Sequence, residues 1–209
     1  PPSVFIVASA VGFYGNRGEE PLTEESPSGE GFLADTAVRW ESAADTAREA
    51  GIRVVNARFG LIMSRKGGLL SRVKIPFQSA LGGKLGSGRQ WWPWISLPDV
   101  VSGLTYLIVN EDISGPVNFT TPTPVRNEEF TKLMSKTLSR PAWLHVPAAI
   151  IRLVFGEMGE ETMLSSHRAY PDKLRAAGFE WQFESLEDVL HYELIASRVD
   201  RRGDTSMNQ

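Results

Sequence analysis

The 209-residue sequence predicts an α/β fold with a parallel β-sheet, on three observations. Residues 4–10 read VFIVASA, the apolar run of a buried strand, and a short aromatic stretch then closes at Gly15. Alanines recur at three- and four-residue intervals as far as Gly51, as on one face of a helix, and residues 53–58 read RVVNAR, a second apolar strand. A strand, a helix and a strand in this order form the crossover unit of parallel sheets.

The later elements follow from the same two periodicities and from turn signals. Residues 16–31 are rich in Gly, Pro, Glu and Ser and predict a surface loop. The sequence then predicts, in chain order, an amphipathic helix over 70–81, a strand over 91–96, a helix over 98–110, a strand over 116–120 and a helix capped by Asn127. The last of these helices carries an apolar stripe made of Phe130, Leu133, Met134 and Leu138.

The C-terminal quarter of the chain has shorter and more mixed patterns. Residues 148–198 read as small helices with one or two short strands, ending on a helix capped by Ser185 with Asp188 in its first turn. We therefore predict a main α/β part over residues 1–142, a small module over 143–198 and a flexible polar tail over 199–209.

The composition favours a small-molecule partner. The formal charge of −3, from 22 basic and 25 acidic residues, leaves no excess of Lys and Arg for nucleic acid or for an anionic membrane. No apolar run approaches the roughly 18 to 20 residues of a membrane span. The chain has no cysteine, which excludes disulfides and thiolate metal ligands, and its three histidines, His145, His167 and His191, share no ligand spacing. We expect a cytoplasmic protein that binds no metal.

Four local motifs, in this order, resemble the extended short-chain dehydrogenase/reductase superfamily from its catalytic strand onward. They are ASAVGFYG at 8–15, PLTE at 21–24 with SP at 26–27, RFGLI at 58–62, and GSG at 86–88 followed by WISLPD at 94–99. A closer resemblance is to the epimerase-family branch, which has a C-terminal module of unknown function. The matching landmarks of that branch are FLA and WE within 32–41, GG and PF within 67–77, GE at 156–157, PDKL at 171–174 and GF at 178–179.

The resemblance implies the C-terminal part of a Rossmann-like doubly wound parallel sheet, with a small α+β module on the substrate side. The glycine-rich phosphate cradle of such domains belongs to an earlier strand and helix, and only Pro1, Pro2 and Ser3 precede the first strand here. We therefore expect the intact polypeptide to extend upstream by roughly 80 to 110 residues. With that half present, the cofactor would be NAD or NADP, and the residues implied to bind it are Ala8, Ser9, Ala10, Arg58, Phe59, Gly60, Leu61 and Ile62.

Catalysis in the superfamily uses a Tyr, a Lys four residues later and a Ser or Thr hydroxyl. No Tyr and Lys have that spacing in this chain, and the best-matching positions are Leu33 and Ala37, or Phe32 and Thr36 if the alignment shifts by one residue. Ser9 is the candidate hydroxyl. Tyr14 is the phenol nearest the inferred cleft, where it is a candidate proton donor or, alternatively, an aromatic wall.

The substrate side also departs from the superfamily pattern. Members that bind sugar nucleotides carry an Arg that clamps the diphosphate, and Trp92 stands at the matching position, with Arg89 close by. The tryptophans are candidates either to stack on a flat or apolar ligand or to pack in the core. The candidate substrate-binding residues are Gly12, Phe13, Tyr14, Arg89, Trp92 and Trp94.

Two further charged residues have alternative interpretations. Glu41 is either a catalytic carboxylate or an anchor on a helix face, and Arg58 either binds an anion or pairs with a buried carboxylate. The sequence thus predicts an NAD(P)-binding, epimerase- or oxidoreductase-like protein for an unknown small molecule. The alternative is a non-catalytic NADP(H)-binding sensor or interaction protein that has lost the Tyr and Lys. A homodimer is compatible with either.

Overall fold

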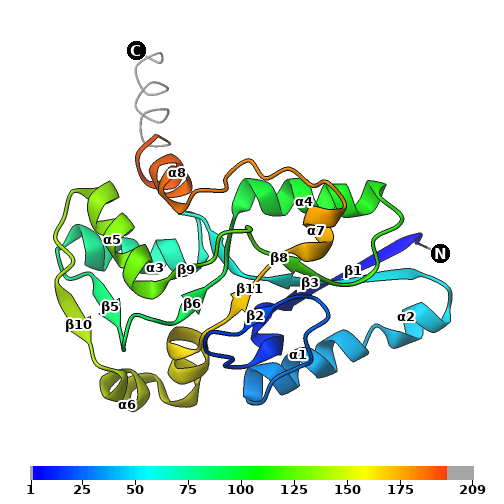
Figure 1. The fold of residues 1–209 in the computed structure, drawn as a ribbon, viewed down its shortest axis with the longest axis horizontal. Helices are drawn as coiled ribbons and strands as arrows, with labels where there is room; N and C mark the ends of the chain where they lie inside the picture. Colours follow the sequence, from blue (N-terminus) through cyan, green and yellow to red (C-terminus); the bar gives the residue numbers. More distant parts are fainter. Residues whose placement is uncertain (1, 197–209) are drawn as a thin grey trace, which may run out of the picture.

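The computed structural model, which describes residues 2–196, contains a three-stranded parallel sheet in the half of the molecule that holds the N-terminus (Figure 1). Its strands are β1 (Val4–Ala10), β3 (Arg53–Phe59) and β8 (Gly115–Phe119), in the order β1-β3-β8. The predicted α/β class and parallel sheet are therefore confirmed. The register places Ser9 beside Arg58 and Arg58 beside Asn118, so three polar residues form one row across the sheet.

Helices cover both faces of this sheet. On one side lie α1 (Phe32–Ser42) and α2 (Asp45–Glu49), and on the other lie α4 (Leu97–Val109) and α7 (Asp172–Ala176) (Figure 1). The alternation of buried side chains along β3 explains the layers, because Val54 packs with Val7 and Ala44 while Val55 packs against α4. The sequence predicted a single helix up to Gly51. The structure has two helices there, α1 and α2, separated by Ala43 and Ala44.

A second hydrophobic core lies beside the sheet. It is formed by α3 (Gly68–Gln78), α5 (Asn127–Leu138), α8 (Leu186–His191), the turn η3 (Tyr192–Ala196) and the short strands around them. These strands pair as β4 (Leu61–Met63) with β7 (Trp94–Ser96), β6 (Trp91–Trp92) with β9 (Val125–Arg126), and β5 (Gly83–Leu85) with β10 (Leu144–Val146). Pro93 divides the strand predicted over 91–96 into β6 and β7.

The C-terminal part of the chain returns to the first loop. After α6 (Ala148–Gly159) and the π-helical turn η2 (Glu160–Leu164), strand β11 (Arg168–Ala169) pairs with β2 (Pro21–Leu22). The surface loop predicted over 16–31 therefore contains a strand, and Leu22 and Glu24 in it are buried. The division of the chain at residue 142 stays a prediction, and the predicted tail at 199–209 lies outside the described residues.

Two predicted helix caps differ in the structure. Asn127 is the first residue of α5 rather than its cap, and its Oδ1 accepts a hydrogen bond from the Leu85 amide at 2.9 Å. Ser185 precedes α8 without a side-chain capping bond. A side-chain cap is present at a different helix, α4, where Ser96 Oγ accepts a hydrogen bond from the Asp99 amide at 3.0 Å. Within residues 2–196, no helix has the length and apolarity needed to span a membrane.

Candidate functional site

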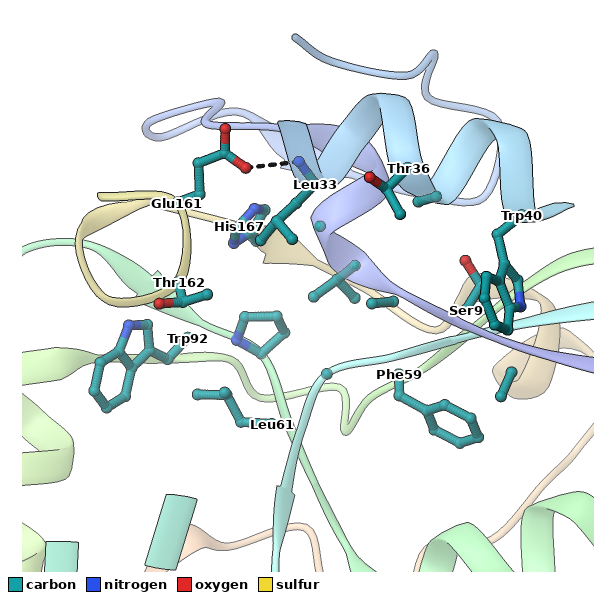
Figure 2. Close-up of a pocket in the computed structure, with 17 residues that line it drawn as sticks. Ser9, Leu33, Thr36, Trp40, Phe59, Leu61, Trp92, Glu161, Thr162 and His167 are labelled. Atoms are coloured by element: carbon teal, nitrogen blue, oxygen red, sulfur yellow. Dashed lines mark hydrogen bonds between the residues drawn. The ribbon is translucent and has the colours of Figure 1, made fainter. Parts of the chain in front are cut away.

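A cavity of about 460 Å³ opens where β1 and β3 end (Figure 2). The end of β1, the 3-10 turn η1 (Val11–Tyr14), helix α1, the β3–β4 junction, Trp92 with Pro93, and η2 with the residues after it form its wall. The carboxyl ends of parallel strands are where open α/β sheets bind ligands. The lining residues are Ala8, Ser9, Ala10, Val11, Gly12, Leu33, Thr36, Ala37, Trp40, Phe59, Gly60, Leu61, Trp92, Pro93, Glu161, Thr162 and His167.

The structure brings eight of the predicted site residues to this cavity and leaves six away from it. Those on the wall are Ala8, Ser9, Ala10, Gly12, Phe59, Gly60, Leu61 and Trp92. Those that do not line it are Phe13, Tyr14, Arg58, Ile62, Arg89 and Trp94. The ends of β1 and β3 therefore line one cavity, as predicted. Apart from Ser9, the polar side chains predicted for the site lie outside it.

Arg58 is engaged in a buried ion pair. Its Nε and Nη2 donate to Oε1 and Oε2 of Glu41, each at 2.8 Å, and the Phe13 ring lies against the guanidinium, 3.4 Å from its carbon to the ring centroid. Both side chains of the ion pair are almost fully excluded from solvent. The interpretation of Glu41 as a helix anchor and of Arg58 as its partner agrees with this geometry, whereas a cofactor contact by Arg58 does not.

Tyr14 is completely buried on the far side of that ion pair. Its hydroxyl donates to Asn118 Oδ1 at 2.7 Å and accepts from Arg58 Nη1 at 3.0 Å. Burial raises the pKa of Tyr14 above its ordinary value. The expectation of a cleft phenol that donates a proton is corrected, because the hydroxyl has both partners inside the protein and η1 turns the ring into the packing around Leu22.

Packing also explains the other residues that lie away from the cavity. Ile62 packs against the core under α4, and Trp94 is fully buried with its Nε1 donating to the Thr123 carbonyl at 2.9 Å. For Trp94 the alternative of core packing is therefore the correct one. Arg89 is exposed, and its backbone carbonyl accepts from Arg126 at 2.6 Å. Trp92 belongs to both cavity and core, and its buried Nε1 has no hydrogen-bond partner among residues 2–196.

The positions that match the superfamily's Tyr and Lys are apolar and face the cavity. Leu33 and Ala37 lie one helical turn apart on the cavity side of α1, and Thr36 joins them on the wall. Phe32, which matches in the shifted alignment, is 62% exposed and is absent from the wall. The Thr36 hydroxyl donates to the Phe32 carbonyl of its own helix at 2.7 Å. None of these four residues is equipped to carry a proton to a ligand.

Ser9 holds its proton toward the interior. Its Oγ donates to Glu41 Oε1 at 2.7 Å, so the carboxylate that binds Arg58 also fixes the serine hydroxyl. Asn56 is the third residue that donates to Glu41, from Nδ2 to Oε2 at 3.2 Å. A chain of charge-assisted hydrogen bonds therefore connects the cavity wall to the middle of the sheet.

Three wall residues that the sequence reasoning did not propose come from the C-terminal segment. Both carboxylate oxygens of Glu161 accept hydrogen bonds, from the Phe32 and Leu33 amides of α1, each at 2.7 Å. Figure 2 shows the bond to Leu33. The Thr162 hydroxyl donates to the Met158 carbonyl. The His167 ring makes no hydrogen bond within the described part of the chain, and burial lowers its pKa to about 4. These three residues belong to no recognisable sequence motif, so the sequence alone gave no signal for them.

Replacing Glu161 by alanine is expected to loosen the first turn of α1. The carboxylate satisfies two backbone donors at the positive end of the helix, so its loss should speed hydrogen exchange of the Phe32 and Leu33 amides about fivefold. The matched control is Glu160→Ala, which removes an exposed pair with Arg152 and should leave both amides unchanged. Unchanged hydrogen exchange of both amides in the Glu161 variant would show that Glu161 does not hold the first turn of α1.

No cluster of three or more His, Cys, Asp or Glu residues that could hold a metal ion occurs in residues 2–196. The candidate site is therefore an apolar cavity with Ser9, Glu161 and His167 as its main polar features.

Solved structures with a similar fold define the class of protein. Human epimerase family protein SDR39U1 (isoform 2), solved with NADPH, has a TM-score of 0.84 and 29% identity, covering 92% of this chain and 65% of that one. Thermus thermophilus UDP-glucose 4-epimerase, solved with NAD, has a TM-score of 0.71 at 15% identity, covering 91% of this chain and 62% of that one, a likeness of fold alone. The fold is the Rossmann-like fold of the NAD-dependent epimerases in the short-chain dehydrogenase/reductase superfamily.

Sequence comparison places the chain more narrowly. It is 43% identical over 190 residues to the epimerase family protein Mb2239 of Mycobacterium bovis, covering 91% of this chain and 63% of that protein. Residues 146–192 match a domain of unknown function, DUF1731. The chain is thus a homologue of the epimerase family proteins, as the resemblance predicted, and it spans less than two thirds of the length of the curated relative. Glu161, Thr162 and His167 all belong to the DUF1731 segment.

Proposed function

We propose that this chain supplies the substrate side of an NAD(P)(H)-binding protein of the extended short-chain dehydrogenase/reductase type, with a small molecule bound in the cavity. The cavity at the carboxyl ends of β1 and β3 is the observation that carries the proposal. The NADPH complex of the human relative supports the choice of cofactor. Bound nicotinamide would supply hydride transfer, and the protein would supply binding and orientation.

The residues around the two strand ends fit a flat ring. Ala8, Ala10 and Gly60 present little or no side chain, and Phe59 and Leu61 give an apolar surface on the neighbouring strand end. These residues would hold the nicotinamide side of the cofactor. The DUF1731 segment closes the opposite wall through η2 and His167 (Figure 2). Its role in this proposal is to complete the small-molecule cavity and to tie it to α1 through Glu161.

A non-catalytic NADP(H)-binding protein is the second candidate. It is favoured by the apolar residues at positions 33 and 37. It is also favoured by the two ionisable side chains on the wall, Glu161 and His167, since neither is placed to exchange a proton with a ligand at pH 7. Glu161 is bound to α1, and the low pKa of His167, about 4, keeps its ring neutral at pH 7. Turnover separates the candidates. Oxidation of NADPH with a carbonyl compound, or reduction of NADP with an alcohol, supports an enzyme, whereas cofactor binding without turnover in either direction supports the second candidate.

Nicotinamide contact can be tested directly on the 209-residue chain. Saturation-transfer NMR with NADPH is expected to give signal on the nicotinamide ring protons, with weak overall affinity because the binding residues named here reach only that end of the cofactor. Ala10→Leu narrows the cavity and should reduce this signal several-fold. Ala50→Leu, on the exposed end of α2, is the matched control. Equal signal in the Ala10 variant, or signal on the adenine protons alone, would contradict the proposal.

A further inference from the structure

The hydrogen-bonding direction of Ser9 is fixed by its surroundings. Glu41 receives both guanidinium contacts of Arg58 at 2.8 Å and is therefore ionised, and an ionised carboxylate only accepts hydrogen bonds. The 2.7 Å contact between Ser9 Oγ and Glu41 Oε1 consequently uses the serine proton. Rotating that proton toward the cavity would leave two oxygens facing each other at this distance, inside a buried network.

The oxygen of Ser9 is nevertheless on the cavity wall. Ser9 is half-buried and lines the cavity beside Trp40, on the side away from Thr162 and Trp92 (Figure 2). A hydroxyl oxygen has two acceptor lone pairs, and the contact with Glu41 leaves them available. Ser9 therefore presents an acceptor to the cavity. A ligand atom that can only accept hydrogen bonds, such as a carbonyl oxygen, therefore forms no hydrogen bond with Ser9.

The rest of the wall offers no counter-ion to a small charged ligand. The Thr36 and Thr162 hydroxyls donate to carbonyls of their own helical turns, and the Glu161 carboxylate is committed to two amides of α1. Most other lining residues are apolar. An ionised ligand group would lose its hydration without gaining a counter-ion in this cavity, which is costly. His167, neutral at pH 7, is left to act as donor or acceptor for a second polar group.

We propose that the cavity selects an uncharged, mainly apolar small molecule that carries a hydroxyl group, and that this hydroxyl donates its hydrogen bond to Ser9 Oγ. The inference rests on the proposed function, because it assigns a ligand class to the same cavity. Ser9 is in this sense a specificity-determining residue, and Glu41 and Arg58 are positioning residues that set its direction. The ligand class follows from one juxtaposition: a serine on the wall whose proton is held by a buried ion pair.

Three compounds with one carbon skeleton test the direction of this hydrogen bond. Indane, 1-indanone and 1-indanol are each titrated into the 209-residue chain, and binding is followed on the methyl signals of Ala8, Ala10 and Ala37, which line the cavity. We expect 1-indanol to bind about fivefold more tightly than 1-indanone, the size of effect that one hydrogen bond gives. Ser9→Ala should remove this preference while leaving the affinity for indane unchanged. Ser9→Thr keeps a hydroxyl and should retain the preference.

The other outcomes are distinguishable. Equal or tighter binding of 1-indanone, or a preference for 1-indanol that survives in Ser9→Ala, overturns the inference. Binding of all three compounds with one affinity overturns it as well, while leaving the small-molecule cavity of the proposed function intact. If no compound shifts the alanine methyl signals, both the inference and the proposed cavity fail. Intact alanine methyl spectra of the variants show that the fold is kept.

Discussion

Replacing Glu41 by alanine is expected to lower the free energy of unfolding by about 3–5 kcal/mol. The substitution leaves the Arg58 guanidinium, whose side chain is 4% exposed, without its counter-ion in the protein interior. It also removes the acceptor for Ser9 and for Asn56. Urea unfolding at pH 7 measures the effect, as a lower midpoint with an unchanged dependence of stability on urea concentration.

An exposed ion pair provides the control for this prediction. Glu187→Ala breaks the ion pair with Lys136. The two side chains are 48% (Glu187) and 69% (Lys136) exposed, so the substitution should lower the free energy of unfolding by less than about 1 kcal/mol. The paired replacement of Glu41 by leucine and Arg58 by methionine should recover much of the loss, since it leaves no buried charge. A cost for Glu41→Ala as small as that of the control would show that the pair is not buried as described.

The ion pair connects several elements around the cavity. Glu41 comes from α1, Arg58 from β3, and through the Tyr14 hydroxyl the network reaches Asn118 of β8. Asn118 in turn donates its backbone amide to Glu24, whose pKa is raised by burial. Such a network specifies how the helix lies on the sheet, and it sets the Ser9 hydroxyl at the edge of the cavity. Stability and the proposed ligand preference therefore depend on the same residues.

Much of the fold could be predicted because the main elements have local signals. The apolar runs of β1 and β3, and the helical spacing between them, determine a parallel pair, and parallel strands bring their carboxyl ends together. The family resemblance implied that Ala8 to Ala10 and Phe59 to Leu61 bind the cofactor, and the parallel pairing of the two strands brings both groups to the cavity wall. The break between α1 and α2 was not predictable in this way, because Ala43 and Ala44 are good helix formers. Ala44 packs against Val7 and Val54, a tertiary contact.

The polar part of the site depends on contacts between distant parts of the chain. Tyr14 follows the strand end by a few residues, which suggested a place in the cleft, but η1 turns it toward Asn118 far along the sequence. Glu161 and His167 belong to short irregular elements with no periodicity, and their position depends on β11 pairing with β2. Sequence spacing carries no information about either contact, so only the three-dimensional structure assigns these side chains.

Lowering the pH from 6.5 to 4 is expected to destabilise the protein by about 3 kcal/mol through His167. Burial lowers the pKa of this ring to about 4, whereas a histidine in the unfolded chain titrates near 6.5. Between these values the unfolded chain takes up a proton that the folded chain does not, so stability falls as the pH is lowered through this window and is fully retained above it. His167→Gln has no such group and should lack this share of the pH dependence.

The measurement is the difference in unfolding free energy between the parent and His167→Gln at several pH values, in which the other titrating groups, including buried Glu24, cancel. We expect the difference to change by about 3 kcal/mol between pH 6.5 and pH 4 and to be constant above pH 7. An NMR titration of the His167 ring gives the folded pKa independently. A difference that does not vary with pH would mean that the ring is hydrated or paired, and the cavity would then lose the neutral imidazole on its DUF1731 wall.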